Sequence, residues 1–144
     1  SFDFPLDQFW AVVTESERLC SIEIAHENLE ILCQAGVRIA LDDYGIGYSN
    51  IHRLAKLPIR RVKIDKSIVE HVEDNPKYAG VFRSSVQLAR ALGAEVVAEG
   101  VETAGQLSEI KRYGCKYIQG YFFYKPMPSE DCLNLLYNRA SSVA

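Results

Sequence analysis

The chain has 144 residues, of which 48% are hydrophobic and 24% charged, and its formal net charge is −3. A chain of this size folds as one ordinary globular domain or part of one, burying about 70% of its unfolded surface. The slight acidity excludes the basic footprint of nucleic-acid-binding proteins, so we expect no nucleic acid polymer as a partner. No apolar run approaches the ~20 residues that span a bilayer, and no signal peptide opens the chain. These features favour a cytoplasmic location, although a parent protein could be membrane-anchored through other segments.

Short β-rich runs alternate with amphipathic helical stretches, which predicts an α/β fold with a parallel sheet. In chain order, the expected strands are 9–14, 37–41, 61–64, 95–98 and 116–119. The expected helices are 24–35, 49–56, 67–73, 76–92, 104–113 and 130–140.

Signals for helix ends support these boundaries. Asn75 and Pro76 supply an N-cap and a first-turn proline, and the segment 103–106 matches a capping box. Glycines stand where three helices should stop, at Gly36, Gly93 and Gly114. The cysteines Cys20, Cys33, Cys115 and Cys132 lack zinc-site spacing, so we expect reduced and mostly buried thiols.

Each of the five expected strands ends in a polar residue that can take part in chemistry. In chain order these residues are Glu15, Asp42 with Asp43, Lys63 with Asp65, Glu99, and Gln119. Because the carboxyl ends of parallel strands meet at one edge of a sheet or barrel, we expect these groups to converge there. Side chains alternate along a strand, so Lys63 and Asp65 should share one face of the sheet.

The expected cluster is rich in carboxylate oxygens, the ligands that Mg²⁺ and Mn²⁺ prefer. Glu15, Asp42, Asp43, Glu99 and also Asp65 form this acidic set. A metal pair would neutralise the crowded charges, clamp a phosphate and lower the pKa of a bound water. Lys63 could then stabilise charge on a phosphoryl group or orient the water, and Gln119 could hold a ligand or water by hydrogen bonds.

Simpler interpretations exist for individual residues. Asp42 and Asp43 alone fit an Asx-type turn or a helix cap. Glu102 could cap the helix that begins near Thr103, or it could steady the loop beside Glu99. The aromatic residues at 121–124 are expected to close the core rather than to stack on a base.

Five ordered motifs together resemble the EAL domain family of bacterial cyclic di-GMP phosphodiesterases. They are TES at 14–16, DDYGIGYS at 42–49, LP at 57–58 followed by KID at 63–65, VAEGVE at 97–102, and QGY at 119–121 followed by Pro126. The resemblance runs from about Phe9 to Pro128. It implies a (β/α)8-like TIM barrel that hydrolyses cyclic di-GMP to linear pGpG with magnesium or manganese, in signalling proteins that can carry a sensor or GGDEF-type domain.

The resemblance also implies a role for each matching residue. Glu15 and Asp42 resemble metal ligands, and Asp43 resembles the ligand of a second metal. Lys63 is similar to the residue that positions the catalytic water, and Glu99 to the carboxylate that assists in the proton network. The other matches are Gln119, similar to a glutamine near the metal water, and Glu102, similar to a supporting acid.

Two departures from the family pattern shape the expectation. The Glu-x-Leu motif and a metal-binding Asn would precede residue 1, and a full barrel has about 250 residues. We therefore expect a partial barrel, the later strands only, which is inactive alone and associates as a homodimer or by swapping through exposed strand edges.

Ile46 is the second departure, because the family has a small or hydroxyl-bearing residue in this loop, which links the metals to the dimer interface. It motivates an alternative, a degenerate EAL domain that acts as a cyclic di-GMP receptor or a protein-interaction module. A metal-independent barrel glycosidase with two strand-end carboxylates is a more distant alternative.

Overall fold

The computed structural model describes residues 5–14, 22–45 and 55–141, with only the backbone described at 22–25 and 139–141. Five strands form one sheet: β1 (Trp10–Thr14), β2 (Arg38–Tyr44), β3 (Ile59–Ile64), β4 (Glu95–Ala98) and β5 (Tyr117–Ile118). A short 3-10 turn, η1 (Leu6–Gln8), precedes them. The helices are α1 (Ile22–Gln34), α3 (Lys66–Val69), α4 (Pro76–Ala91), α5 (Ala104–Arg112) and α6 (Ser129–Ser141).

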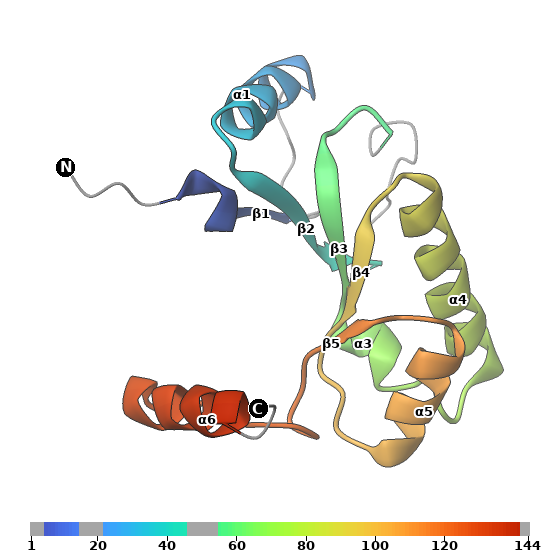
Figure 1. Ribbon diagram of the computed structural model, residues 1–144. Coiled ribbons are helices and arrows are strands. Elements are labelled where there is room, and N and C mark those ends of the chain that lie inside the picture. The colour runs from blue at the N-terminus through green and yellow to red at the C-terminus, as the bar shows by residue number, and fades with distance from the viewer. Residues whose placement is uncertain (1–4, 15–21, 46–54, 142–144) are drawn as a thin grey trace.

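The sheet has the strand order β1-β2-β3-β4-β5, and every neighbouring pair is parallel. The predicted α/β class with a parallel sheet is therefore confirmed. Figure 1 shows the strands lying side by side, with α4 and α5 along one side of the sheet. All five carboxyl ends consequently lie at the same edge.

The main hydrophobic core lies between the sheet and these helices. Val62 and Ile64 of β3 are buried in it with Val96 and Ala98 of β4, against the fully buried Phe82 of α4. Because side chains alternate along a strand, the neighbours of these core residues on β3 and β4 point to the opposite side of the sheet. We call that opposite side the polar face, and it carries Arg38, Asp42, Arg61, Lys63, Glu95 and Glu99.

The predicted helix-end signals are confirmed. The Asn75 side chain accepts a hydrogen bond from the amide of Lys77, and Pro76 opens α4. Thr103 and Gln106 form a reciprocal capping box at the start of α5. Positive φ angles occur after α1, α4 and α5, at Gly36, Gly93 and Gly114.

Several predicted boundaries were wrong. The second strand continues past 41 to Tyr44 because it pairs with β3 beyond the acidic pair. The helix expected at 67–73 is regular only from Lys66 to Val69, and the strand expected at 116–119 keeps only Tyr117 and Ile118. The helix expected at 49–56 lies mostly outside the described residues, as does Ile46.

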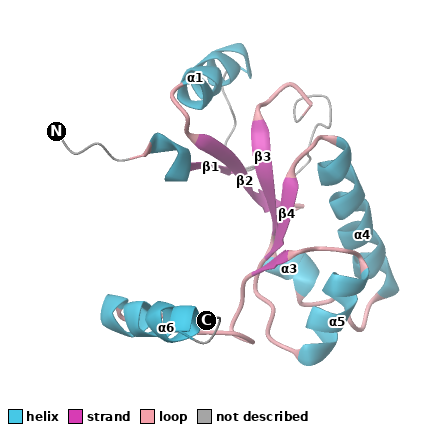
Figure 2. Ribbon diagram, in the orientation of Figure 1, coloured by secondary structure: helices cyan, strands magenta, loops and turns pink. Residues whose placement is uncertain are grey.

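The aromatic segment 121–124 does not close the core, contrary to the prediction, since its four side chains are 41–56% exposed. Cys33, Cys115 and Cys132 are free thiols, but only Cys115 is buried. Figure 2 shows α6 standing apart from the other helices, at the end of the chain. In the described part of the chain, no helix combines the length and apolarity that a membrane crossing requires.

Candidate functional site

A β-bulge shapes the carboxyl end of β2. Leu41 pairs with Val62 and Tyr44 pairs with Ile64, so the two residues Asp42 and Asp43 oppose a single residue of β3. That single residue is Lys63. A bulge bends its strand and changes the direction of side chains, and bulges are frequent next to active sites. The acidic pair therefore lies opposite the lysine, at the edge where the strands end.

Asp43 adopts the left-handed region, with a φ of 55°. Asp tolerates this conformation better than most residues, because its short side chain can bond to nearby backbone. Here the carboxylate of the preceding residue, Asp42, accepts a hydrogen bond from the Asp43 amide at 3.1 Å. This hydrogen bond thus stabilises the backbone turn between the two acids.

Lys63 joins two carboxylates from neighbouring strands. Its Nζ lies 2.9 Å from Oδ1 of Asp42 and 2.6 Å from Oε1 of Glu99. The three side chains are only 17–22% exposed, so solvent screens these contacts incompletely. The structure thus brings together three of the residues that the sequence placed at strand ends.

The pKa shifts reflect an excess of negative charge. Partial burial opposes the charged form of Lys63, but the hydrogen bonds that its ammonium donates to Glu99 and Asp42 outweigh it, and the pKa of Lys63 is raised above 10.5. For Glu99, burial is the largest effect and the charge of Asp42 adds to it, so the pKa of Glu99 is raised above 4.5 despite Lys63. Both pKa values move upward, which favours the charged form of Lys63 and disfavours that of Glu99, because one ammonium is shared by two acids and Glu99 is the more buried acid.

Backbone hydrogen bonds hold Glu99 in place. Its amide donates to the carbonyl of Ile64 at 3.1 Å, which extends the pairing of β4 with β3 by one residue. On the other side, the amide of Gln119 donates to Ala98 and its carbonyl accepts from Val101. The backbone of Gln119 is thus bonded to residues on both sides of Glu99 in the sequence, and the Gln119 side chain is exposed.

Asp65 and Glu102, two further acids predicted to support the site, have other contacts. Asp65 caps α3, since its carboxylate accepts a hydrogen bond from the Ser67 amide at 2.7 Å. Glu102 does not cap α5, because Thr103 does so. Instead, Glu102 pairs with Lys66 at 2.5 Å and so ties the segment after β4 to the start of α3.

Lys66 is a residue that the sequence reasoning missed. Its side chain crosses Gly100, where an added Cβ would come within 2.5–2.8 Å of the lysine stem. Its hydrogen bond with Glu102 raises the pKa of Lys66. Lys66 follows Lys63 by three positions, and Glu102 follows Glu99 by three positions. This equal spacing is the sequence signal that could have indicated the Lys66–Glu102 pair.

Whether a metal ion can bind at this edge depends on the side chains that could coordinate it. Asp42, Asp43 and Glu99 offer the hard oxygen ligands of Mg²⁺ or Mn²⁺, and Lys63 pairs with two of these acids, Asp42 and Glu99. In the part of the chain that the structure describes, no group of three or more His, Cys, Asp or Glu side chains is placed to hold a metal. Glu15, the first predicted ligand, lies outside the described residues, directly after Thr14, whose partner across the sheet is Asp42.

The sequence of this chain is similar to those of known proteins. The family model of the EAL domain matches residues 3–126. The cyclic di-GMP phosphodiesterase RocR of Pseudomonas aeruginosa is 35% identical over 133 residues, which are 92% of this chain and 34% of RocR.

Two solved structures are also similar. The EAL domain of Mycobacterium smegmatis DcpA has a TM-score of 0.85 at 36% identity, over 90% of this chain and 58% of that one. The Bacillus subtilis YkuI protein, with an EAL domain and solved with cyclic di-GMP and calcium, has a TM-score of 0.73 at 33% identity. That match covers 85% of this chain and 29% of YkuI. The chain thus spans well under two thirds of each of these relatives.

Proposed function

Because the chain belongs to the EAL domain family, we propose that its Asp42, Lys63 and Glu99 serve the hydrolysis of cyclic di-GMP to linear pGpG. The observation that carries this proposal is the Lys63 ammonium lying between the two carboxylates at the carboxyl edge of a parallel sheet. In α/β barrels that edge is where the chemistry takes place. The naming of RocR as a cyclic di-GMP phosphodiesterase supports the choice of substrate.

We further propose that the chain supplies the later strands of a (β/α)8 barrel and is inactive alone. The match to just over half of the DcpA EAL domain supports this domain assignment. Glu15, Asp42 and Asp43 would hold magnesium or manganese. Such an ion, when bound, lowers the pKa of a water molecule and neutralises phosphate charge.

Other residues of this chain would orient the water, transfer protons and hold the substrate. The Lys63 ammonium donates hydrogen bonds, so it would orient the attacking water and stabilise negative charge on the phosphoryl oxygens. Glu99, whose pKa is raised, would accept the proton that the water loses as its oxygen bonds to phosphorus. The bond to the 3′ oxygen breaks, and that oxygen would take up the proton that Glu99 received from the water. Gln119 would hold the water or substrate, while Glu102 and Asp65 support the loops.

A chimera tests this proposal directly. Residues 9–126 of this chain would replace the matching segment of RocR, and cyclic di-GMP hydrolysis would be followed with Mg²⁺ or Mn²⁺. We expect the chimera to produce pGpG, and Lys63→Met to reduce kcat by at least about 100-fold, as loss of one transition-state donor does. Lys77→Met is the matched control, because Lys77 is exposed on α4 and away from the site. It should retain full activity.

The outcomes separate the alternatives. A folded chimera that binds cyclic di-GMP without cleaving it would favour the receptor over the enzyme. Hydrolysis that persists after chelation of the metal would contradict the metal assignment. Equal activity of Lys63→Met and Lys77→Met would show that Lys63 has no part in the reaction.

We also propose that the isolated chain associates with a second copy. Exposed apolar side chains on α6, including Leu133 and Leu136 at 52% and 59%, support association, as does the 53% exposed Val12 on the edge strand β1. Light scattering coupled to gel filtration should give a mass above 16.2 kDa. A compact monomer at all concentrations would contradict this proposal.

A further inference from the structure

The backbone turns directly after Glu99. The Glu99 amide donates a hydrogen bond to the carbonyl of Ile64 at 3.1 Å, and the Val101 amide donates one to the carbonyl of Gln119 at 3.1 Å. Between these two bonded amides, Gly100 adopts the left-handed region with a φ of 71°. The place of the Glu99 carboxylate therefore depends on how firmly this turn is held.

The side chain of Lys66 covers the turn. Lys66 is the first residue of α3, so it belongs to the chain that follows β3. A Cβ added to Gly100 would come within 2.5 Å of its Cγ, 2.7 Å of its Cβ and 2.8 Å of its Cδ. Because glycine has no Cβ, the lysine stem packs directly on the backbone of the turn.

Beyond Gly100, the Lys66 ammonium reaches Glu102. Its Nζ lies 2.5 Å from Oε1 of Glu102, and this hydrogen bond, together with the charge of Glu102, raises the pKa of Lys66. Both side chains are exposed, so the pair contributes little to the stability of the whole fold. The stem on the turn and the ion pair beyond it together span the backbone that carries Glu99.

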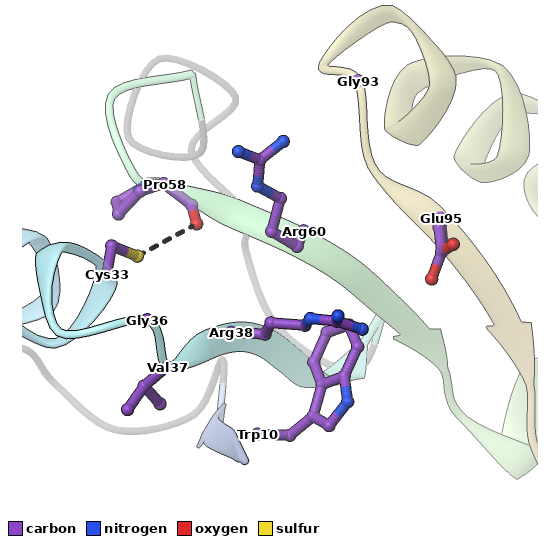
Figure 3. A pocket seen from close by; sticks show the side chains of 9 residues that line it. All are labelled: Trp10, Cys33, Gly36, Val37, Arg38, Pro58, Arg60, Gly93 and Glu95. Carbon is purple, nitrogen blue, oxygen red and sulfur yellow. Dashed lines mark hydrogen bonds between the residues drawn. The ribbon is translucent and has the colours of Figure 1, made fainter. Parts of the chain in front are cut away.

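Three ion pairs connect the chain around β3 with the chain around β4. In order towards the carboxyl edge they are Arg61–Glu95, Lys63–Glu99 and Lys66–Glu102. The pair of the proposed catalytic site is the middle one. Glu95 lies at the opposite edge, where it lines a pocket of about 500 Å³ together with Trp10 and Arg38 (Figure 3). The outer two pairs are thus alike in kind, but only one of them adjoins the turn after Glu99.

We propose that Lys66 is a positioning residue of the catalytic site. With Glu102 it clamps the turn at Gly100. The clamp keeps the Glu99 carboxylate in contact with the Lys63 ammonium, 2.6 Å away. A group that transfers a proton must stay within hydrogen-bond reach of its partners, so even a small displacement lowers the rate. The kinetic part of this inference rests on the proposed phosphodiesterase function, whereas the clamp can be observed without a substrate.

Amide hydrogen exchange of the whole chain tests the clamp by itself. Lys66→Met and Glu102→Gln should each speed exchange of the Glu99 and Val101 amides about two- to fivefold, since an exposed pair holds its surroundings only modestly. Glu95→Gln is the matched control, because Glu95 and Glu102 are both 43% exposed and each pairs with one base. It should leave these two amides unchanged. Unaltered exchange in Lys66→Met, or an equal effect of Glu95→Gln, would overturn the clamp.

Kinetics of the RocR chimera test the positioning role. Lys66→Met and Glu102→Gln should each lower kcat about tenfold and leave KM nearly unchanged, because substrate binding does not require Glu99 to be aligned. Lys66→Arg should retain most of the activity, and the double variant should lose no more than either single one, since both residues act through one pair. Glu95→Gln should retain full activity.

The outcomes of the two measurements are separable. A normal kcat in Lys66→Met, or an equal loss in Glu95→Gln, would overturn the positioning role. A chimera that is inactive before any substitution would count against the proposed function instead. Hydrogen exchange of the chain would still decide whether Lys66 and Glu102 hold the turn.

Discussion

Replacing Gly120 with alanine should destabilise the protein strongly, for purely steric reasons. The φ angle of Gly120 lies outside the left-handed region, so alanine is not excluded by its backbone conformation. An added Cβ, however, would lie 2.1 Å from the carbonyl oxygen and 2.3 Å from the nitrogen of Val101. Both are backbone atoms, which cannot rotate aside as a side chain can, so the two segments would have to separate.

The expected cost follows from this overlap. Overpacking typically costs 1–3 kcal/mol, and because backbone must move here we expect about 3 kcal/mol. The Gln119 carbonyl and the amides of Val101 and Phe122 would lose hydrogen bonds across the same contact. Residues 119–122 would then move away from the end of β4 beside Glu99, so ligand binding at the site should weaken as well.

Urea unfolding followed by circular dichroism measures this effect, with Gly80→Ala as the matched control. Gly80 is inside α4, and an added Cβ there meets no atom within 4 Å. That substitution should stabilise the protein by about 0.5–1 kcal/mol, since glycine is a poor helix former. The two variants should therefore differ by about 4 kcal/mol in the free energy of unfolding. Equal stabilities of Gly120→Ala and the wild type would refute the argument.

Three further predictions concern stability and reactivity. Arg61 lowers the pKa of Glu95, so this ion pair contributes fully to the free energy of unfolding above the ordinary pKa of 4.5. The contribution is lost as the pH falls through the lowered pKa of Glu95. Glu95 is largely exposed, so Glu95→Gln should lower the unfolding free energy by at most about 0.5 kcal/mol at pH 7 and by less at pH 3; a larger loss at pH 3 would contradict this. Cys132 is exposed, whereas Cys115 is buried and burial raises its pKa. Iodoacetamide should therefore alkylate Cys132 before Cys115, as peptide mass spectrometry would show, and equal rates of the two would contradict the burial of Cys115. Asn75→Ala removes the cap of α4 and should cost about 1 kcal/mol in urea unfolding, and no change would show that the cap is dispensable.

The sequence predicted the parallel sheet because strands and helices alternate along the chain, and it predicted polar residues at one edge because each strand ends in such a residue. It did not predict the bulges at Asp42–Asp43 and at Arg60, since a bulge depends on how two strands pair. The aromatic segment 121–124 was misjudged for a related reason. Hydrophobicity favours burial, yet the amide of Phe122 bonds to the carbonyl of Val101 at the end of the sheet, and the segment leaves the core there.

The polar face carries charged groups at both of its edges, and strand geometry keeps them apart. Arg38 and Asp42 are four residues apart on β2, so they share a face and lie about 13 Å apart at 3.3 Å per residue. Small Ala40 lies between them. The Debye length at physiological salt is about 8 Å, so charges at one edge act weakly on those at the other. Charges at the two edges should therefore be only weakly coupled, and a change of charge at Arg38 should affect activity at the Lys63 site little.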